Sequence, residues 1–380
     1  MSHPIDPVAF AQELIRCRSV TPAEGGALDL LQATLQDLGF VCTRLPFDEP
    51  GTEPVYNLYA RRDGAAPNLC FAGHTDVVPP GDPAAWSVDP FAGALVGDDL
   101  IGRGAVDMKG AIAAWVAAVS RLPRDAGALS LLITGDEEGP SVNGTRKMLE
   151  WLEGQGERLG VCVVGEPTSG ERLGDTVKIG RRGSLNAWIT VHGTQGHSAY
   201  PQYADNPIHR LARALTALTD APMDGGSAHF EPTSLQVTSV DVGNPATNVI
   251  PAQATAQLNV RFNDLWDGAA VEGWIRERVA ASCPRHEIAV RVSGESFLSA
   301  PGPLSDALAQ ACERVLGFAP ELGTGGGTSD ARFIKDACPV AELGLRNATA
   351  HQVDERVPAA ELRAIADVYE AAARRLLDGS

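Results

Sequence analysis

The amino-acid sequence predicts an α/β domain with a mixed, largely parallel sheet flanked by helices, interrupted by an inserted α+β domain of the split βαβ, ferredoxin-like type. Three observations lead to this prediction. At 380 residues the chain is long enough for about two domains. Short apolar runs alternate with helical patterns up to about residue 180, and a β-α-β-β-α-β order follows between about 183 and 294. Helix and strand patterns then resume, so we expect one domain at 1–181 and 295–380 and an insert at 182–294.

The N-terminal part opens with a helix, whose start is marked by Asp6 as N-cap and Pro7 as the first helical residue. Gly39 is placed to end a second helix. Buried strands are expected at the apolar runs 69–72, 129–134 and 161–164. Between the first two runs, an alanine-rich segment from about 108 to 121 predicts a helix that packs closely on the sheet.

The insert begins with residues 184–192, which alternate between apolar and polar as a half-buried strand does, and continues with a helical pattern at 206–218. Strands near 235–242 and 254–262, a helix near 268–282 and a strand near 287–292 complete it. The segment 299–303, Ser-Ala-Pro-Gly-Pro, marks its end.

The composition excludes several classes of protein. With 31 Lys and Arg against 48 Asp and Glu, the formal charge is −17, which argues against nucleic acids and anionic membranes as partners. The seven cysteines form no CxxC pair, and the longest apolar run, 111–119, is too short to span a membrane. The N-terminus lacks the basic and apolar segments of a signal peptide. We therefore expect a reduced, cytoplasmic enzyme that acts on small molecules, peptides or cations.

Acidic and histidine residues follow directly on three of the predicted strands. His74 and Asp76 follow the first, the Asp-Glu-Glu segment 136–138 follows the second, and Glu166 follows the third. Because the carboxyl ends of parallel strands meet at one sheet edge, these residues are expected where ligands bind in α/β proteins. Asp107 lies in the loop that opens the alanine-rich helix.

Each of these clusters alone is typical of a capped helix or a solvated acidic loop. Together, at one edge of a sheet, so many carboxylates would repel one another unless cations held them. Nitrogen and oxygen donors without cysteine favour zinc, manganese or cobalt over calcium or magnesium. The sequence therefore predicts a metal site.

Several motifs around these residues occur together in one known family of hydrolases. They are Gly73-His-Thr-Asp-Val-Val-Pro-Pro-Gly-Asp82, Trp86-x-x-Asp-Pro-Phe91, Gly102-Arg-Gly-Ala-x-Asp-Met-Lys-Gly110, Thr134-Gly-Asp-Glu-Glu-Gly139 and Gly165-Glu-Pro167. On these motifs the sequence resembles the co-catalytic di-zinc amidohydrolase and peptidase family that contains acetylornithine deacetylase and carboxypeptidase G. The matches run from about residue 10 to 355 and cover both expected domains.

A second set of motifs resembles the branch of that family that acts on N-succinyl-diaminopimelate. They are Lys178-x-Gly-Arg-Arg-Gly-Ser184, Gly196-His-Ser-Ala-Tyr-Pro201, Ala246-Thr-Asn-Val-Ile-Pro251, Gly327-Thr-Ser-Asp330 and Asn347-Ala-Thr-Ala-His351. The resemblance implies hydrolysis of N-succinyl-L,L-2,6-diaminopimelate to succinate and L,L-diaminopimelate, in diaminopimelate and lysine biosynthesis.

The resemblance also implies two Zn²⁺ per subunit, with Co²⁺ able to substitute. His74 and Glu166 would bind one zinc, Glu138 and His351 the other, and Asp107 would bridge both. The peptide bond after Asp107 would be cis.

Three residues have catalytic roles by the same resemblance. Asp76 would orient His74, and Glu137 would be the general base that takes a proton from water and returns it to the leaving amine. His197, in the insert, would donate to the oxyanion in the active site of a neighbouring subunit. A homodimer formed through the inserted domain, which serves as a lid, is therefore implied.

The implied substrate carries several carboxylates, so its pocket must be locally basic, and arginine forks suit carboxylate recognition. The residues that we expect to bind the substrate are Arg181, Ser184, Tyr200, Asn248, Arg261, Gly327, Thr328 and Asn347, with Arg182 in the same turn as the first. Leu345-Arg346 departs from the Gly-Pro-like or Gly-Leu-like pair of the family, which bears on fine specificity.

Two other functions stay open at this point. One is another amide hydrolase of the same family, such as an N-acetyl-ornithine deacetylase or a dipeptidase, which only kinetics would separate. The other is a binding protein that kept the fold and lost the chemistry. The complete set of implied ligands and Glu137 argue against it.

Overall fold

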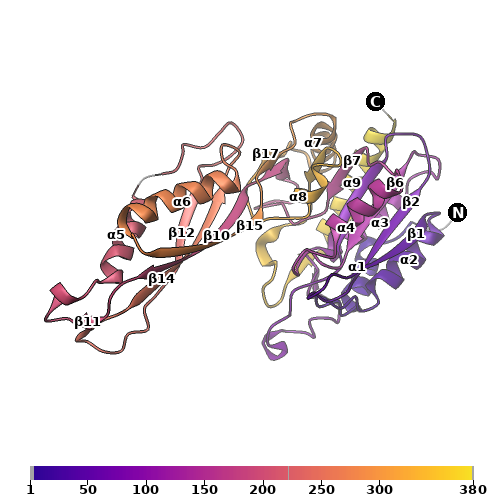
Figure 1. Cartoon of the computed structure of the whole chain (residues 1–380). Helices are drawn as coiled ribbons and strands as arrows, with labels where there is room; N and C mark the ends of the chain where they lie inside the picture. The colour runs from indigo at the N-terminus through magenta and orange to yellow at the C-terminus, as the bar shows by residue number, and fades with distance from the viewer. Residues whose placement is uncertain (1–3, 221, 379–380) are drawn as a thin grey trace. The chain divides into compact units, whose positions relative to one another are not determined.

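The structure is a computed structural model that describes residues 4–220 and 222–378. These residues form two compact units (Figure 1). The first unit comprises the described residues up to Ile179, Ser299–Gly323 and the described residues from Ser329 onward. The second unit comprises Gly180–Leu298 and Thr324–Thr328. Among the helices described, none is long and apolar enough to cross a membrane.

The first unit is built on a mixed sheet with the strand order β1-β2-β6-β3-β7-β18-β8-β17. Its strands are β1 (Val41–Phe47), β2 (Val55–Arg62), β3 (Leu69–His74), β6 (Leu129–Thr134), β7 (Val161–Val164), β8 (Thr176–Lys178), β17 (Glu321–Gly323) and β18 (Val340–Glu342). Strand β3 pairs in parallel with β6 and β7, and β18 continues in parallel beyond β7, whereas β1 and β2 are antiparallel. Strands β3 and β6 are buried along their length, as strands at the centre of a parallel sheet are.

Helices cover both faces of this sheet. The register places Ala60 and Phe71 on one face, where Phe71 stacks on Trp115 with 4.8 Å between ring centroids. Tyr59 precedes Ala60 and so points to the other face, where its ring contacts Trp151 edge-on at 5.9 Å. The helices of the unit are α1 (Pro7–Arg16), α2 (Ala27–Asp37), α3 (Lys109–Ser120), α4 (Thr145–Gly154), α7 (Pro303–Leu316), α8 (Ala331–Ile334) and α9 (Ala359–Asp378), with the short 3₁₀ turns η1 (Pro83–Ala85) and η3 (Asn347–Thr349).

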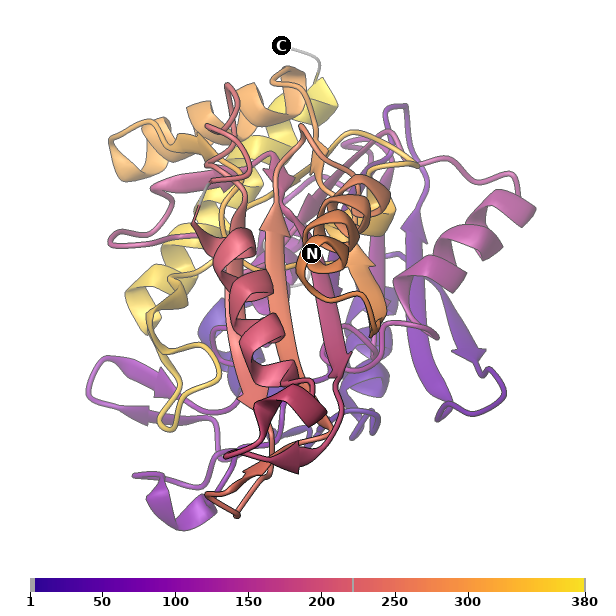
Figure 2. The same cartoon turned by 60° about the vertical axis from the view of Figure 1, so that its left-hand side comes forward.

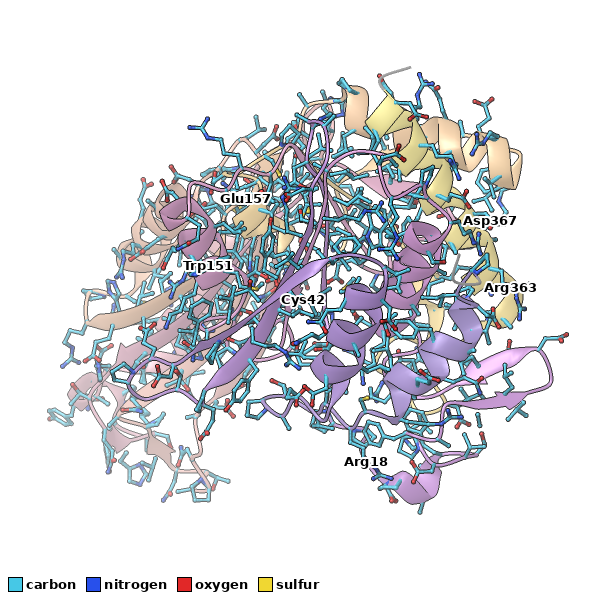
Figure 3. The ribbon with its side chains drawn as sticks, turned by 90° about the vertical axis from the view of Figure 1, so that its right-hand side faces the viewer. Arg18, Cys42, Trp151, Glu157, Arg363 and Asp367 are labelled. Atoms are coloured by element: carbon cyan, nitrogen blue, oxygen red, sulfur yellow. The ribbon has the colours of Figure 1, made fainter. Side chains whose placement is uncertain are left out.

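Helix α3 lies against β3, α1 and α9 and is buried from Lys109 to Val119. Its alanines and Gly110 allow this close approach, because larger side chains would separate the helix from its neighbours. Helix α9 is exposed on one side, where Arg363 and Asp367 lie one turn apart (Figure 3). Helix α3 confirms the helix predicted at 108–121. The predicted start of α1 is also confirmed, because the Asp6 side chain accepts the N–H of Val8 at 3.4 Å.

A small antiparallel sheet joins distant parts of the first unit. Its strands are β4 (Ala94–Val96), β5 (Asp99–Ile101) and β19 (Arg356–Pro358), in the order β19-β5-β4. Strand β5 runs into the loop that carries Asp107, and β19 follows the loop that carries His351. Pairing of β5 with β19 therefore brings these two loops together.

The second unit is a split βαβ fold. Its antiparallel sheet has the strand order β12-β14-β10-β15, and α5 and α6 cover one face (Figure 2). The elements are β10 (Gly183–His192), α5 (Pro207–Thr219), β12 (Ser234–Asp241), β14 (Gln253–Phe262), α6 (Gly268–Ser282) and β15 (His286–Gly294). Alternate residues of β10 and β14 point into the apolar core beneath these helices, which for β10 is what the alternation at 184–192 predicted.

Shorter elements complete the second unit. Strand β9 (Gly180–Arg181) pairs with β16 (Phe297–Leu298), and β11 (Gly196–His197) pairs with β13 (Val249–Ile250). A 3₁₀ turn, η2 (Pro201–Tyr203), follows β11. The predicted fold class, an α/β sheet unit and an α+β unit with the β-α-β-β-α-β order, is confirmed.

Candidate metal centre

The residues expected to bind metal lie at the carboxyl ends of neighbouring strands. His74 is the last residue of β3, Glu137 and Glu138 follow β6, and Glu166 follows β7. Because β6, β3 and β7 are adjacent and parallel, their ends open at one edge of the sheet. Asp107 lies just before α3, and its peptide bond to Met108 is cis, as the resemblance implied.

His74 is fully buried and held in one orientation. Its Nδ1 donates to the main-chain carbonyl of Asp76 at 2.8 Å, so the proton of the neutral ring is on Nδ1. Nε2 then faces the carboxylates, 3.1 Å from Asp107 Oδ1 and 3.7 Å from Glu166 Oε1. This is the arrangement of a histidine that offers Nε2 to a metal.

Asp107 lies between the two histidines. Its Oδ1 is 3.1 Å from Nε2 of His74, and its Oδ2 is 3.2 Å from Nε2 of His351. The same His351 nitrogen is 2.7 Å from Glu138 Oε1. One carboxylate thus presents each of its oxygens to a different imidazole, which is the geometry that a bridging ligand needs.

The donor atoms fall into groups whose members lie within 4.8 Å of one another. One group is His74, Asp107 and Glu166, and another is Asp107, Glu138 and His351. A further group is His74, Glu137 and Glu138. The first two groups share Asp107, so the arrangement suits a pair of neighbouring cations of the kind that bind nitrogen and oxygen donors.

Charge and burial shift the pKa values of these groups strongly. Hydrogen bonds to Asp107 and Glu138 raise the pKa of His351 to about 10. Burial opposes the charge on His74, but the hydrogen bond and charge of Asp107 outweigh burial and hold its pKa well above the usual value. Burial likewise opposes ionisation of Asp107, yet hydrogen bonds with His351 and His74 hold its pKa well below the usual range.

The pKa of Glu137 is shifted in the direction opposite to that of Asp107. Burial, followed by the nearby charge of Glu166, raises the pKa of the Glu137 carboxyl well above its ordinary value. A carboxyl with a raised pKa can take up and release a proton near neutral pH.

The buried Asp76 fixes the segment that carries the two glutamates. Its Oδ1 accepts the N–H of Glu137 at 3.3 Å, and its Oδ2 accepts the N–H of Glu138 at 3.0 Å. Burial raises its pKa to about 6, although the charge of His74 and these N–H groups act in the other direction. The carboxylate is 3.7 Å from Nδ1 of His74, beyond hydrogen-bond length, so the contact of Asp76 with His74 is made by the main-chain carbonyl.

Most of the expected substrate-binding residues belong to the second unit. Arg181 is buried and donates from Nη1 to the carbonyl of Gly327 at 2.7 Å, next to Thr328. Ser184 lies opposite Arg261 in the pairing of β10 with β14. Burial and the nearby charge of Arg182 lower the pKa of Arg261, so this part of the unit is locally basic despite the net charge of −17.

His197 and two other expected residues lie together in the same unit. Tyr200 donates its N–H to the carbonyl of His197 at 2.9 Å, and the rings are edge-on at 5.5 Å. Ser198 donates its N–H to the carbonyl of Asn248 at 2.9 Å. His197 and Tyr200 are exposed. The remaining expected residue, Asn347, belongs to the first unit, where it is exposed and donates its N–H to Ser169 O at 3.0 Å.

Two buried charged residues near this centre, Arg103 and Glu355, have no role predicted from the sequence. Glu355 follows His351 by four residues, and Arg103 precedes Asp107 by four. This four-residue spacing to the expected ligands is the only hint that the sequence offers. Spacing alone does not reveal that the two residues are buried or which groups they contact.

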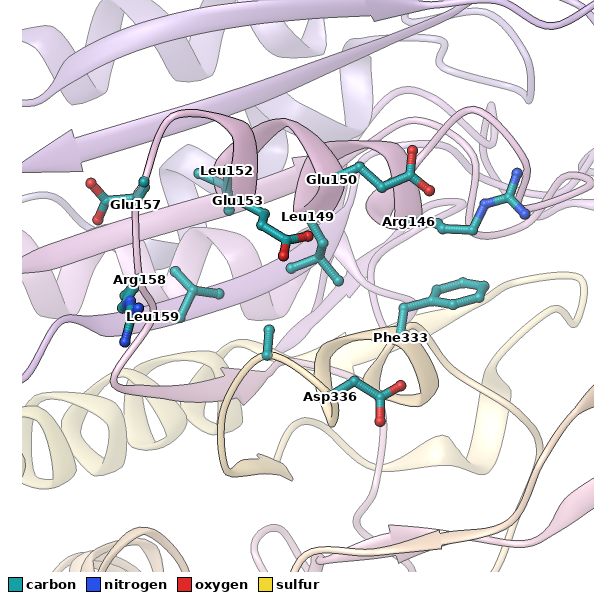
Figure 4. A pocket seen from close by; sticks show the side chains of 12 residues that line it. Arg146, Leu149, Glu150, Leu152, Glu153, Glu157, Arg158, Leu159, Phe333 and Asp336 are labelled. Carbon is teal, nitrogen blue, oxygen red and sulfur yellow. The ribbon is translucent and has the colours of Figure 1, made fainter.

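A separate groove of 790 Å³ lies in the first unit between α4 and α8 (Figure 4). Leu149, Leu152, Leu159 and Phe333 form its apolar lining, and charged side chains surround them. None of the expected site residues is among those that line it.

Comparison with known proteins places the chain among metal-dependent hydrolases. The family model described as peptidase family M20/M25/M40 matches residues 70–375. A succinyl-diaminopimelate desuccinylase from Rhodospirillum centenum is 56% identical over 379 residues, which are 99% of this chain and 98% of that protein.

Two solved structures have the same fold. Aminopeptidase PepT from Bacillus cereus has a TM-score of 0.78 at 19% identity and covers 98% of both chains. A Bacillus subtilis protein described as a dinuclear metal-binding peptidase of the M20 family has a TM-score of 0.71 at 16% identity, also over 98% of both chains.

Proposed function

The chain belongs to peptidase family M20/M25/M40, and on this basis we propose that it is a metal-dependent amidohydrolase that converts N-succinyl-L,L-2,6-diaminopimelate to succinate and L,L-diaminopimelate. The observation that carries the proposal is the identity of more than half of the residues, over nearly the whole of both chains, to a protein named succinyl-diaminopimelate desuccinylase. The reaction belongs to diaminopimelate and lysine biosynthesis, and we propose that it takes place in the cytoplasm.

Two Zn²⁺ are the proposed cofactors, with Co²⁺ able to replace them. His74 and Glu166 would hold one cation and Glu138 and His351 the other, with Asp107 shared. The residues fit such a pair, because the donor groups overlap at Asp107 and each of its oxygens faces a different histidine. The Nδ1 proton of His74 is bonded to a carbonyl, which leaves Nε2 as the donor atom.

When bound, the cations supply Lewis-acid activation of a water molecule and of the amide carbonyl. Glu137 takes a proton from that water and returns it to the leaving amine. Asp76 holds the backbone of Glu137 in place, and the side chains of the consecutive residues Glu137 and Glu138 diverge at the turn after β6. Glu138 can therefore face His351 while its neighbour faces the water.

His197 is proposed to stabilise the oxyanion in the active site of the partner subunit. Its Nδ1 accepts the N–H of Ala199 at 3.0 Å, so the proton of the neutral ring lies on Nε2 and is available to donate. The proposed homodimer forms through the second unit, whose sheet ends on both sides in strands, β12 and β15, with no further pairing among the described residues.

Recognition of the substrate carboxylates is assigned to the arginines of the second unit. Arg181 and Arg261 are proposed to bind the carboxylates through their guanidinium groups. Ser184, Tyr200, Asn248, Gly327, Thr328 and Asn347 are proposed to provide neutral hydrogen bonds.

The proposal is tested by kinetics on N-succinyl-L,L-diaminopimelate and, in parallel, on N-acetyl-ornithine. We expect the succinylated substrate to have the higher kcat/KM, a chelator to abolish turnover, and Zn²⁺ or Co²⁺ to restore it. Faster turnover of N-acetyl-ornithine would contradict the assigned substrate, and full activity of the metal-free protein would contradict the metal-dependent mechanism.

A further inference from the structure

We propose that Glu355 is a positioning residue that joins the loops of Asp107 and His351 and thereby sets the affinity of the metal position that these residues share with Glu138. This inference rests on the proposed function, which assigns these three side chains as ligands. Glu355 itself touches neither the substrate nor a metal in this scheme.

The Glu355 carboxylate is completely buried and accepts hydrogen bonds at both oxygens. Its Oε1 accepts the N–H of Val106 at 2.8 Å and the N–H of Asp107 at 3.1 Å. Its Oε2 accepts the N–H of Gly104 at 3.1 Å and Arg103 Nη1 at 2.6 Å. We call this arrangement, Glu355 with residues 103, 104, 106 and 107, the Glu355 clamp.

The fold places Glu355 opposite this loop through main-chain contacts. Arg356 directly follows Glu355 and begins β19, which pairs with β5. Gly102 donates its N–H to the Glu355 carbonyl at 2.9 Å, so the pairing continues one step beyond the strands. The loop then turns at Gly104, which has φ +87° and where a Cβ would lie 2.9 Å from Val77, so glycine is needed there.

Arg103 extends the clamp to the other loop. Its Nη1 binds Glu355, while Nη2 donates to the His351 carbonyl at 3.3 Å. The guanidinium is buried over the Trp86 ring, 5.3 Å from its centroid. One buried ion pair therefore holds the main chains of Asp107 and His351.

This arrangement predicts an unequal effect on the two metal positions. One position takes Asp107, Glu138 and His351, and the clamp holds the backbones of the first and the last. The other position takes Asp107, His74 and Glu166, and His74 has a separate anchor in the Asp76 carbonyl. Loss of the clamp should therefore weaken the Glu138–His351 position more than the His74–Glu166 position.

The experiment titrates metal-free protein with Zn²⁺, and separately with Co²⁺, by calorimetry. In Glu355→Gln an amide NH₂ replaces one acceptor and faces donors, so we expect the affinity of one of the two metal-binding steps to fall about 10- to 100-fold, the usual cost of losing a partner that orients a ligand. The affinity of the other step should change far less. Cobalt absorption spectra would report the altered ligand geometry independently of activity.

Asp354→Asn is the matched control. It removes the same charge one residue away, where Asp354 Oδ1 accepts the Ser87 N–H at 2.8 Å outside the clamp. Its φ of +56° is a conformation that asparagine tolerates. We expect its metal affinities to match those of the wild type.

Thermal unfolding of the metal-free variants tests whether they fold. If Glu355→Gln does not fold, Arg103→Lys keeps the charge but loses the forked donor that joins Glu355 to His351, and it should give the same unequal loss at smaller size. Unchanged metal affinities, or equal losses at both positions, would overturn the proposal. Wild-type protein that binds two metals without hydrolysing the succinylated substrate would contradict the proposed function alone.

Discussion

A single residue of the site can make contacts through both its side chain and its main chain. Asp76 holds Glu137 and Glu138 through its carboxylate, and it fixes His74 through its carbonyl. Asp76 was expected to orient His74, and the contact that the structure shows is made by its main-chain carbonyl. A motif specifies which side chain is present and not which of its atoms makes a contact.

Replacing Glu137 separates catalysis from metal binding at this scale. In Glu137→Gln we expect kcat on N-succinyl-L,L-diaminopimelate to fall by about 10²- to 10⁴-fold, the usual contribution of a general base. Metal content, measured by atomic absorption, should stay at the wild-type level, whereas Glu138→Gln should lose metal. Metal loss in Glu137→Gln would show that this residue is itself a ligand.

The pKa shifts of the histidines predict how metal binding depends on pH. His351, with a pKa of about 10, and His74, whose pKa is also raised, must lose protons before a metal can bind. Metal affinity should therefore rise with pH between 6 and 8, with protons released. Calorimetry in buffers of different ionisation enthalpy measures how many protons are released on metal binding. A metal affinity that does not change with pH would contradict the prediction.

The same shift has a consequence for the metal-free protein. Because the pKa of His351 is raised in the folded state, its protonation stabilises the folded protein fully below the unfolded-state pKa of about 6.5. This stabilisation is lost as the pH rises through about 10. Bound metal would remove this dependence, because the ligand is then unprotonated.

Among the elements, α3 connects the sheet to the outer helices through one aromatic cluster. Trp115 stacks on Phe71 of β3 and contacts Tyr369 of α9 edge-on at 5.6 Å. Because α3 begins two residues after Asp107, this packing also supports the loop that leads into the site.

Truncating this cluster should destabilise the first unit. Trp115→Ala is expected to lower the free energy of unfolding by about 3–5 kcal/mol, because it removes a large buried side chain. Trp115→Phe should cost much less, since it keeps a ring against Phe71 and removes a buried indole N–H that lacks a hydrogen-bond partner. Urea denaturation of the metal-free variants measures both values, and equal losses would contradict this account.

The sequence was most informative where the pattern is local. The alanine-rich composition of 108–121 predicted α3, and alternation of apolar and polar residues predicted β10, because one face of a half-buried strand is buried at every second residue. It gave no sign that β19 pairs with β5 or that β18 lies beside β7, since those pairings join segments far apart in the chain. The expected ligands His74, Glu138 and Glu166 follow strand ends and could be grouped from sequence, whereas Glu355 makes only tertiary contacts with this region and could not be found that way.

At the scale of the whole molecule, net charge and local charge differ. The chain carries −17, yet Arg181, Arg182 and Arg261 lie close in sequence or across adjacent strands of the second unit. The net charge therefore argues against nucleic acids as partners, but it does not describe the site that would bind an anionic substrate.

Sharing of residues between subunits can be tested by mixing inactive proteins. His197→Ala alone should lower kcat by about 10²- to 10³-fold, the cost of one oxyanion donor, while His192→Ala, whose imidazole pairs with Glu287 at 3.0 Å, should not. Dimers re-formed from His197→Ala and Glu137→Gln chains should regain about a quarter of wild-type activity, because half are mixed and each has one complete site. No recovery in verified mixed dimers would place His197 in its own subunit's site.

The position of β18 has a consequence for synthesis of the chain. This strand fills the space between β7 and β8, but it is translated about 160 residues after β8, beyond the whole insert. At about 5–20 residues per second, a nascent chain would spend roughly 10–30 s with these two strands unpaired on their facing edges. The second unit can fold during that interval, while the exposed edges of the first are open to pairing with other chains. We therefore expect the chain to depend on chaperones during translation, because the insert separates strands that pair in the finished sheet.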